Sequence, residues 1–435
     1  MEHSTHAGQE TPARQEADNP AAGGALRELS RGRFEEAARQ IRPAILDTRL
    51  IYSEYYSEHM QNQVYFKPEN LQYTGSFKIR GAYYRLCSLP ESEKERGIVT
   101  ASVGNYGLAI AYAARHTGVP VTVVMPKRAS LIQVKRIRGY GAEVLFHGQS
   151  PEEALAYARD LAGELGRIWA EPSGGLAEAV GAGTIALEIL RELPDADYIL
   201  APIGSGGLCA GIAAAAKQVN PQVQVIGVEP AGANCVEQSL RQGRAVTLAQ
   251  VNTIADAAAV RTPARDLLPC IQRFADGILL VDDTELVAAF SDVMENHKMA
   301  VENAGLLTVA ALRHLKRVKG KKIVSVLSGG NMDMVTMASV VQGGLILRDR
   351  IFTVSVLLAD QPGALANVAH VIGEEQGSII KLDHNQFINM NRSESVELRI
   401  TLEAFGTDHK NQIVQALKKQ GYQPRIVSTT GTYEM

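Results

Sequence analysis

The chain contains few of the features that mark disulfide-rich, metal-binding or membrane proteins. It has four cysteines among 435 residues, at positions 87, 209, 235 and 270, and none of them forms a C-x-x-C pair. This scatter excludes a disulfide framework or a zinc site as the organising feature, so no metal is expected, and it predicts buried thiols in a reducing compartment. No apolar run is long enough to cross a membrane, and the first 24 residues lack the apolar core of a signal peptide. A cytoplasmic protein without a membrane partner is therefore expected.

An excess of charge of either sign is also missing. The chain carries 44 Lys and Arg residues against 47 Asp and Glu residues, a formal net charge of -3 at pH 7, without basic clusters. This balance argues against nucleic acid as a partner. With 46% hydrophobic residues, the chain can bury a large core in more than one domain. Residues 1–34 open with a polar stretch and are expected to form a disordered arm.

Strand-like and helix-like segments alternate from about residue 35 to residue 330. Strands are expected at residues 64–67, 98–101, 121–125, 143–146, 198–203, 223–228 and 323–327. Helices are expected at residues 35–41, 106–116, 131–140, 151–165, 177–193, 208–219, 284–297 and 304–318. Such alternation predicts an α/β fold with a parallel sheet covered on both faces. Ligands bind these sheets at the carboxyl ends of the strands, so the loops after strands are the candidate sites.

One lysine has an unusual setting in the stretch from Gln72 to Ala82, where two glycines frame small hydroxyl residues and a helix-like run follows. An amine becomes a nucleophile only when its pKa is lowered by desolvation or by nearby positive charge. We expect Phe77 to desolvate Lys78 and Arg80 to supply the positive charge. A surface lysine in a turn before a helix is the alternative for these residues alone.

A glycine-rich turn, Gly204-Ser205-Gly206-Gly207-Leu208, follows the expected strand 198–203 and opens a helix. Glycines there let backbone N–H groups approach a phosphate, and the helix dipole favours an anion. The turn is neither a P-loop nor a complete G-x-G-x-x-G, because Cys209 occupies the last position. A nicotinamide site remains open, since Glu229 ends the next strand, where an acid could bind a ribose.

Two further loops follow strands. Ser102-Val103-Gly104-Asn105 offers backbone donors for a carboxylate and an amide side chain for a ring oxygen, although it also fits an ordinary helix N-cap. Ser328-Gly329-Gly330-Asn331 places a hydroxyl where it could meet a ring nitrogen without a full charge. An activatable lysine, a phosphate-binding turn, an asparagine loop and a serine loop are together the parts that hold pyridoxal 5'-phosphate.

From Glu35 to Gln342 the chain resembles the threonine/serine dehydratases (threonine ammonia-lyases), which are tryptophan-synthase-β-like, fold type II pyridoxal-phosphate enzymes. The resemblance implies a catalytic domain over residues 35–348, with a small subdomain at about 84–182. The motifs that carry it are Gly75-Ser76-Phe77-Lys78-Ile79-Arg80-Gly81-Ala82, Ser102-x-Gly104-Asn105, Gly206-Gly207-Leu208, Gly227-Val228-Glu229-Pro230 and Ser328-Gly329-Gly330-Asn331.

The resemblance also implies a role for each matching residue. Lys78 would be the Schiff-base lysine and the general base at the substrate Cα. The cofactor would be bound by Phe77, Lys78, Asn105, Gly204, Ser205, Gly206, Gly207, Leu208 and Ser328. The substrate would be bound by Ser102, Val103, Gly104 and Asn105. The implied reaction is β-elimination from a hydroxy amino acid, L-threonine to 2-oxobutyrate and ammonia, and also L-serine to pyruvate.

The chain departs from the family pattern near the expected site. The family usually continues with Ala-Gly-Asn-His-Ala-Gln after the loop serine, whereas this chain has Tyr106 and Leu108 in place of polar residues, which leaves the substrate side chain open. Related racemases have a second serine where Val103 stands, and valine cannot move a proton. Some relatives bind a divalent cation near Glu229, but Cys235 replaces the expected carboxylate and suits Mg²⁺ or Ca²⁺ poorly.

Residues 351–435 change in pattern. The order strand, helix, strand, strand, helix, strand predicts a small α+β sandwich. With Asp-x-Pro-Gly-x-Leu at its first strand-to-helix turn, this part resembles an ACT domain, a module that binds amino acids between paired copies. The resemblance implies a homo-oligomer, dimer or tetramer, and an amino acid effector near Asp360, Gly363 and Leu365. A purely structural pairing module is the alternative.

Other functions share some of these features. A β-replacement enzyme, or an ammonia-lyase for another β-substituted amino acid, would have the same fold. A nicotinamide-dependent oxidoreductase and a non-catalytic amino acid sensor are the alternatives from other classes. Intact Lys78, Asn105 and Ser328 argue against the sensor.

Overall fold

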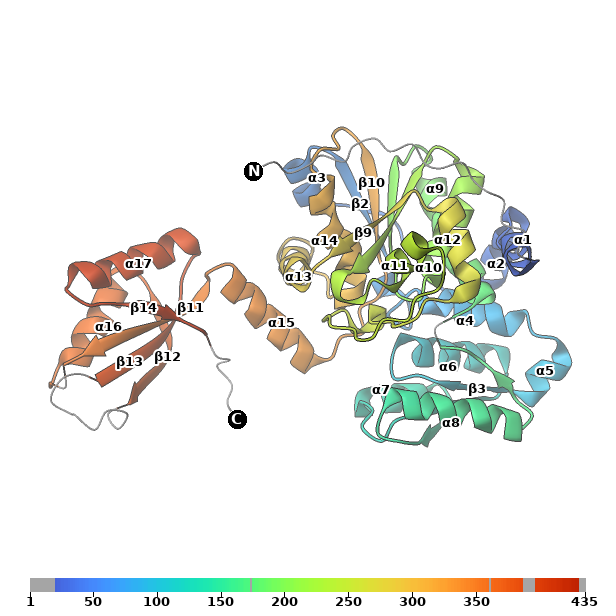
Figure 1. Ribbon diagram of the computed structural model, residues 1–435, viewed down its shortest axis with the longest axis horizontal. Helices are drawn as coiled ribbons and strands as arrows, with labels where there is room; N and C mark the ends of the chain where they lie inside the picture. Colours follow the sequence, from blue (N-terminus) through green and yellow to red (C-terminus); the bar gives the residue numbers. More distant parts are fainter. Residues whose placement is uncertain (1–19, 173, 360, 386–395, 430–435) are drawn as a thin grey trace.

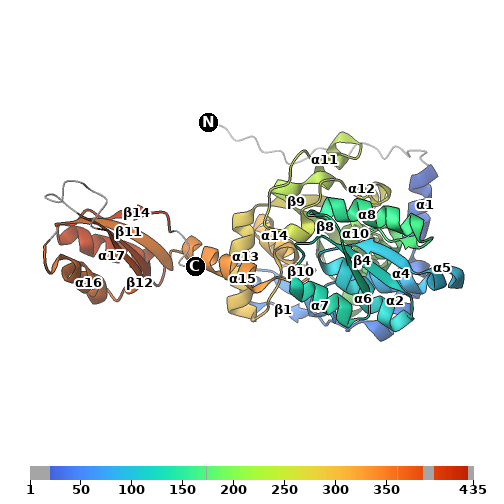
Figure 2. The same ribbon diagram turned by 90° about the horizontal axis from the view of Figure 1, so that it is seen from below.

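The structure is a computed structural model that describes residues 20–172, 174–359, 361–385 and 396–429. Figure 1 shows a large part with two parallel sheets and a smaller C-terminal part that stands apart from it. Helix α15 (Met334–Leu347) joins the two parts, as the perpendicular view in Figure 2 also shows. The α/β core and the separate α+β sandwich expected from the sequence are both confirmed.

The larger sheet has six strands in the order β1-β2-β10-β7-β8-β9, all parallel except β1. Alternate residues of β7 point to opposite faces: Ile199 packs against α9 and α10, and Leu200 against the side of α13 and α14. The sheet is therefore covered on both faces. Its strands are β1 (Ile51–Tyr52), β2 (Gln63–Pro68), β7 (Tyr198–Pro202), β8 (Gln224–Pro230), β9 (Gly277–Val281) and β10 (Lys322–Leu327).

The second sheet has four parallel strands in the order β5-β4-β3-β6 and lies within residues 84–182. Its central strands consist entirely of buried residues, as expected for a parallel sheet covered on both faces. The strands are β3 (Ile98–Ala101), β4 (Val121–Met125), β5 (Glu143–Phe146) and β6 (Ile168–Trp169).

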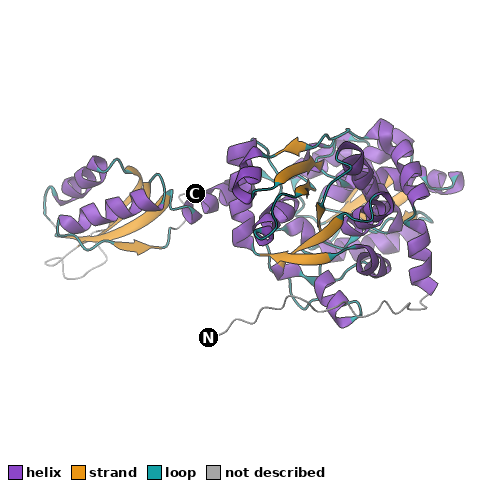
Figure 3. Ribbon diagram, turned by 90° about the horizontal axis from the view of Figure 1, so that it is seen from above, coloured by secondary structure: helices purple, strands orange, loops and turns teal. Residues whose placement is uncertain are grey.

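Helices surround both sheets (Figure 3). The expected single helix at 304–318 is instead a short α-helix flanked by two 3-10 turns (Asn303–Leu306 and Leu312–Leu315), in a segment that is almost fully buried up to Leu312. The α-helices before the linker helix are α1 (Pro20–Glu28), α2 (Arg31–Ile41), α3 (Glu54–Met60), α4 (Lys78–Cys87), α5 (Glu91–Arg96), α6 (Asn105–Thr117), α7 (Leu131–Gly139), α8 (Pro151–Glu164), α9 (Leu176–Glu192), α10 (Gly207–Val219), α11 (Cys235–Gln242), α12 (Leu268–Phe274), α13 (Asp283–His297) and α14 (Leu307–Ala311).

The expectation of a disordered arm over residues 1–34 is wrong for residues 20–34, which are ordered. Helix α1 and the start of α2 pack on the larger part, where Leu29 and Phe34 are completely or almost completely buried. The apolar residues Ala25, Leu29 and Phe34 supply enough buried surface to order this segment. Residues 1–19, the rest of the expected arm, lie outside the described residues.

The C-terminal part is an antiparallel sheet in the order β12-β13-β11-β14, which is the ferredoxin-like βαββαβ topology. Its elements are β11 (Ile351–Leu358), α16 (Ala364–Glu374), β12 (Ser378–Asn385), β13 (Val396–Glu403), α17 (Thr407–Lys419) and β14 (Arg425–Val427). Three residues connect it to the core: Arg348 and Arg350 pair with Glu295 of α13, and Asp349 between them pairs with Lys410 of α17. No described helix is long and apolar enough to span a membrane.

Candidate active site

A cavity of about 220 Å³ lies between the two sheets, at the carboxyl ends of their strands. It brings together residues from the lysine stretch, the asparagine loop, the glycine turn and the serine loop, which are far apart in the sequence. The residues expected at the site that line it are Phe77, Lys78, Ser102, Gly104, Asn105, Gly204, Ser205, Gly206, Gly207, Leu208 and Ser328. The spatial convergence of these loops is the arrangement expected for a ligand site in this fold class.

Lys78 is the first residue of α4, and its amino group is buried in the cavity. Burial lowers the pKa of this lysine below its ordinary value, while the carboxylates of Glu178 and Glu302 act in the opposite direction. The Nζ atom lies 5.3 Å from the centre of the Phe77 ring and 5.9 Å from the centre of the Tyr106 ring. A buried amine with a lowered pKa is more readily neutral than an exposed lysine, and a neutral amine can act as a nucleophile or a base.

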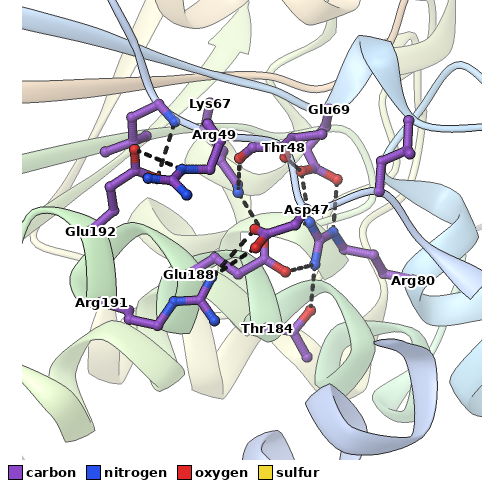
Figure 4. Close-up of polar contacts among 12 residues, drawn as sticks. Asp47, Thr48, Arg49, Lys67, Glu69, Arg80, Thr184, Glu188, Arg191 and Glu192 are labelled. Carbon is purple, nitrogen blue, oxygen red and sulfur yellow. Dashed lines mark hydrogen bonds and ion pairs between the residues drawn. The ribbon is translucent and has the colours of Figure 1, made fainter. Parts of the chain in front are cut away.

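Arg80 does not activate Lys78 in the way expected from the sequence. Its guanidinium is completely buried and is bound by carboxylates: it donates to Glu69 at 2.7 and 2.9 Å and to Glu188 at 2.7 and 2.8 Å (Figure 4). Lys67 also pairs with Glu188, at 2.5 Å. The positive charge of Arg80 is thus neutralised locally, and desolvation is the main cause of the lowered pKa of Lys78.

The glycine turn forms a concave anion site at the start of α10. Gly206 adopts a φ of 106°, in the left-handed region, and a Cβ atom there would lie 2.8 Å from Ile271 Cδ1. The backbone conformation therefore favours glycine at this position, and a Cβ atom would in addition displace the end of the Ile271 side chain. The first N–H groups of this 13-residue helix have no partner within the helix, so they can donate to an anion, which the helix dipole also favours. The turn fits a phosphate group.

Asn105 begins α6 and is held by two partners on the opposite side of the cavity. Its Nδ2 donates to Glu302 Oε1 at 2.7 Å, and its Oδ1 accepts from Asn331 Nδ2 at 2.7 Å. Arg136 in turn donates to Asn331 Oδ1 at 2.9 Å. The Ser102 hydroxyl accepts from the Gly107 N–H at 2.9 Å and so stabilises the loop that precedes the helix. The asparagine side chain and the helix start are thus rigidly oriented.

Glu302, which directly precedes the 3-10 turn Asn303–Leu306, also lines the cavity. Burial, with a smaller contribution from Asp256, raises the pKa of this carboxyl to about 7. The hydrogen bonds from Asn105 and from the Asn331 N–H favour the charged form and act in the opposite direction. Glu302 can therefore change its protonation near neutral pH while it orients Asn105.

Ser328 follows β10, is 5% exposed and lines the cavity. Its carbonyl accepts from the Phe77 N–H at 3.0 Å, which ties the serine loop to the lysine stretch. The hydroxyl supplies a neutral hydrogen-bonding group on this wall.

Three positions differ from the expectations. Val103 is 40% exposed and, unlike its neighbours Ser102 and Gly104, does not line the cavity. Leu108 is completely buried in the core around α6 and does not reach the cavity. Glu178, a residue the sequence analysis did not select, lines the cavity beside Tyr106. A signal for it existed: it is an acid on the otherwise apolar buried face of α9.

The positions expected to bind an effector lie in the C-terminal part, away from this cavity. Gly363 caps α16 with a φ of 89°, and Leu365 is partly buried against that part's core. Asp360 lies outside the described residues.

Glu229, considered above as a cation ligand, is buried and accepts from the N–H groups of Val236 and Glu237 at 2.9 and 2.8 Å. Burial raises its pKa to about 7. Within the described residues, no group of three or more His, Cys, Asp or Glu side chains is placed to hold a metal ion. Cys87, Cys209, Cys235 and Cys270 are all free thiols.

The cavity fits pyridoxal phosphate: a phosphate-sized glycine turn, a buried amine and two polar groups for a ring face one another. Comparisons with known proteins agree. Residues 41–329 match the family described as pyridoxal-phosphate dependent enzyme. An L-threonine ammonia-lyase of Geobacter sulfurreducens is 39% identical over 391 residues, which cover 89% of this chain and 97% of that protein.

Solved structures show the same similarity. A threonine deaminase from Solanum lycopersicum has a TM-score of 0.70 and 31% identity, covering 75% of this chain and 89% of that one. A serine racemase from maize has a TM-score of 0.68 and 32% identity, covering 73% and 98%. The chain belongs to the family of pyridoxal-phosphate dependent enzymes.

Proposed function

We propose that this enzyme catalyses the β-elimination of water from a hydroxy amino acid, chiefly L-threonine to 2-oxobutyrate and ammonia, and also L-serine to pyruvate. The observation that carries the proposal is the position of Lys78, buried in one cavity with the phosphate-binding turn and the Asn105 loop. The activity named for the bacterial and plant relatives supports the same reaction.

Bound pyridoxal phosphate supplies an electron sink that acidifies the Cα–H of the amino acid. The residues of this chain then have separate tasks. The N–H groups of Gly204 to Leu208 would bind the phosphate, and the side chains of Asn105 and Ser328 would hydrogen-bond to the ring. Backbone donors of the loop from Ser102 to Asn105 bind the substrate carboxylate. Lys78, whose neutral form is favoured by burial, takes the proton from Cα.

Ser328 favours elimination over reactions that need a long-lived carbanion, because a hydroxyl does not enforce a protonated ring nitrogen as a carboxylate would. Racemisation needs a second proton carrier on the other face of the substrate. Val103 stands where racemases have a serine, and it carries no exchangeable proton on its side chain. This favours the lyase over the racemase among the two activities named for the similar structures.

The test is 2-oxo acid release from L-threonine and L-serine by the holoenzyme, with Lys78→Ala and, as a control for an ordinary lysine, Lys94→Ala. We expect wild type and Lys94→Ala to form 2-oxobutyrate and Lys78→Ala to lose the activity and the Schiff-base absorbance band. A yellow holoenzyme that releases no 2-oxo acid from either substrate would instead favour β-replacement.

We further infer that the enzyme works in the cytoplasm as a homo-oligomer and that its C-terminal part acts as an ACT-like regulatory domain. Four free thiols suit a reducing compartment. Exposed apolar residues on the linker helix, such as Met334 and Val335, at 74% and 77% exposure, suit a subunit contact. Rate measurements on the full-length enzyme with each common amino acid added in turn would contradict the regulatory role if no rate changed.

A further inference from the structure

Tyr106, Glu178 and Arg85 form a polar cluster at the wall of the cavity beside Lys78. Glu178 Oε1 accepts from the Tyr106 hydroxyl at 2.9 Å and from Arg85 NH1 at 2.9 Å, and Glu178 Oε2 accepts from the Gly175 N–H at 2.9 Å. The carboxylate is 6% exposed, so its orientation is determined by these donors.

The cluster lies close to Lys78 because helices α4 and α9 are in contact beside it. Gly81 is one turn past Lys78 on α4, and a Cβ atom at Gly81 would lie 2.7 Å from the Glu178 Cα atom of α9. Glu178 is also the larger of the two carboxylate influences on Lys78. Tyr106 and Glu178 line the cavity, whereas Arg85 does not and lies behind the carboxylate.

The residues that line the cavity carry more acidic than basic side chains. Among the described residues that line the cavity, Lys78 is the only one with a cationic side chain, and Glu178 and Glu302 are the anionic ones. A bound cofactor phosphate adds further negative charge. The substrate α-carboxylate can be met by backbone N–H groups, but no lining arginine or histidine is present among the described residues for a second carboxylate.

We propose that Glu178, oriented by Tyr106 and Arg85, is a specificity-determining residue that excludes amino acids with an acidic side chain and selects those with a neutral, hydrogen-bond-donating or cationic β-substituent. This deepens the proposed function, on which it rests only in taking the ligand to be an α-amino acid. A buried carboxylate rejects a like charge strongly and accepts a hydroxyl donor at little cost.

The test compares L-asparagine with L-aspartate, two ligands of the same shape that differ in charge. Binding to the holoenzyme is measured by the change in cofactor absorbance, a readout that needs no turnover. We expect wild type to bind L-asparagine at least about tenfold more tightly than L-aspartate, since juxtaposed like charges cost several kcal/mol. Glu178→Gln should remove most of this preference. Tyr106→Phe keeps the carboxylate and should retain it.

Arg85→Gln tests the role of the Glu178 charge by a change that should increase the preference for L-asparagine. This test does not depend on whether the Glu178 variant folds. Without the partly compensating guanidinium, the preference for L-asparagine should increase. The proposal is overturned if wild type binds both ligands equally, if Glu178→Gln leaves the ratio unchanged, or if Arg85→Gln weakens the preference. A preserved ratio in an enzyme that does not deaminate L-threonine would contradict the proposed reaction and leave the role of Glu178 intact.

Discussion

Removal of the Arg80 side chain is the sharpest test of how the site is supported. In Arg80→Met, five hydrogen bonds are lost: two to Glu69, two to Glu188 and one to Thr184. Counted singly at about 1.5–3 kcal/mol each, these bonds would sum to about 7–15 kcal/mol. That sum is too large, because it ignores the hydration that the free guanidinium recovers on unfolding.

The loss of stability in Arg80→Met is better judged from the buried carboxylates that remain without their partner. Glu69 is completely buried and would keep only its contacts with Thr48 and Gln72, so the variant holds an uncompensated buried anion. Breaking a buried pair in this way costs about 3–5 kcal/mol. Glu188 loses less, because its side chain is 16% exposed and Lys67 still neutralises it.

The assay is urea unfolding of the full-length protein, followed by circular dichroism. Arg191→Met is the matched control, because Arg191 pairs with Asp47 at the surface, where the side chains are 67% and 57% exposed (Figure 4). The control should lose no more than about 1 kcal/mol. Adding Glu69→Gln to Arg80→Met should restore part of the stability. Equal losses in Arg80→Met and Arg191→Met would refute the argument that Arg80 is needed to compensate buried carboxylates.

Two further changes probe the cavity. Gly206→Ala should weaken pyridoxal phosphate binding by tenfold or more, about 1.4 kcal/mol, because alanine disfavours the φ of 106° that Gly206 adopts in the glycine turn. Gly118→Ala also carries a positive φ, of 75°, but lies away from the cavity and should leave the affinity unchanged in a cofactor titration. For Glu302→Gln, the pKa of about 7 in the folded chain lies above the ordinary 4.5, so the folded state holds this proton more tightly. The stability of wild type relative to Glu302→Gln should be greatest below pH 4.5 and fall by about 3 kcal/mol as the pH rises through 7. Urea midpoints of the cofactor-free proteins across this range measure it, and a flat difference would show that Glu302 does not titrate there.

The fold was largely predictable because its signals are local. Buried parallel strands such as Val121–Met125 are continuous apolar runs, and the expected ends of this strand and of 143–146 match the structure. The strand Gly277–Val281 was not expected, because it lies at the sheet edge and its residues are mostly half-buried. The ordered segment around Leu29 was missed for a different reason. Its few apolar residues stabilise it only by packing against residues of the core that are distant in the sequence, so the segment itself carries little local signal.

The site was predictable only in part, because charge pairing depends on tertiary contacts. The loops could be recognised from the positions of glycine, serine and asparagine, because these residues favour tight turns and helix starts whose backbone N–H groups can bind a ligand. The partners of a charged residue have no such local signal. Arg80 is 11 residues from Glu69 and 108 from Glu188, and Glu178 is 72 residues from Tyr106. Sequence reasoning therefore selected Lys78, which lines the cavity, but it did not find the charged partners of Arg80.

Lys78 and Arg80, both in the first turn of α4, are both buried, but their pKa values shift in opposite directions. Desolvation disfavours the charged form of both Lys78 and Arg80. Arg80 forms direct hydrogen bonds with two carboxylates, so its charge is retained and ties α4 to α9 and to the 3-10 turn Glu69–Leu71 that follows β2. Lys78 lies near the rings of Phe77 and Tyr106, and the influence of the carboxylates does not outweigh its burial. The same helix thus carries one cation that stabilises the site and one amine that is free to exchange a proton there.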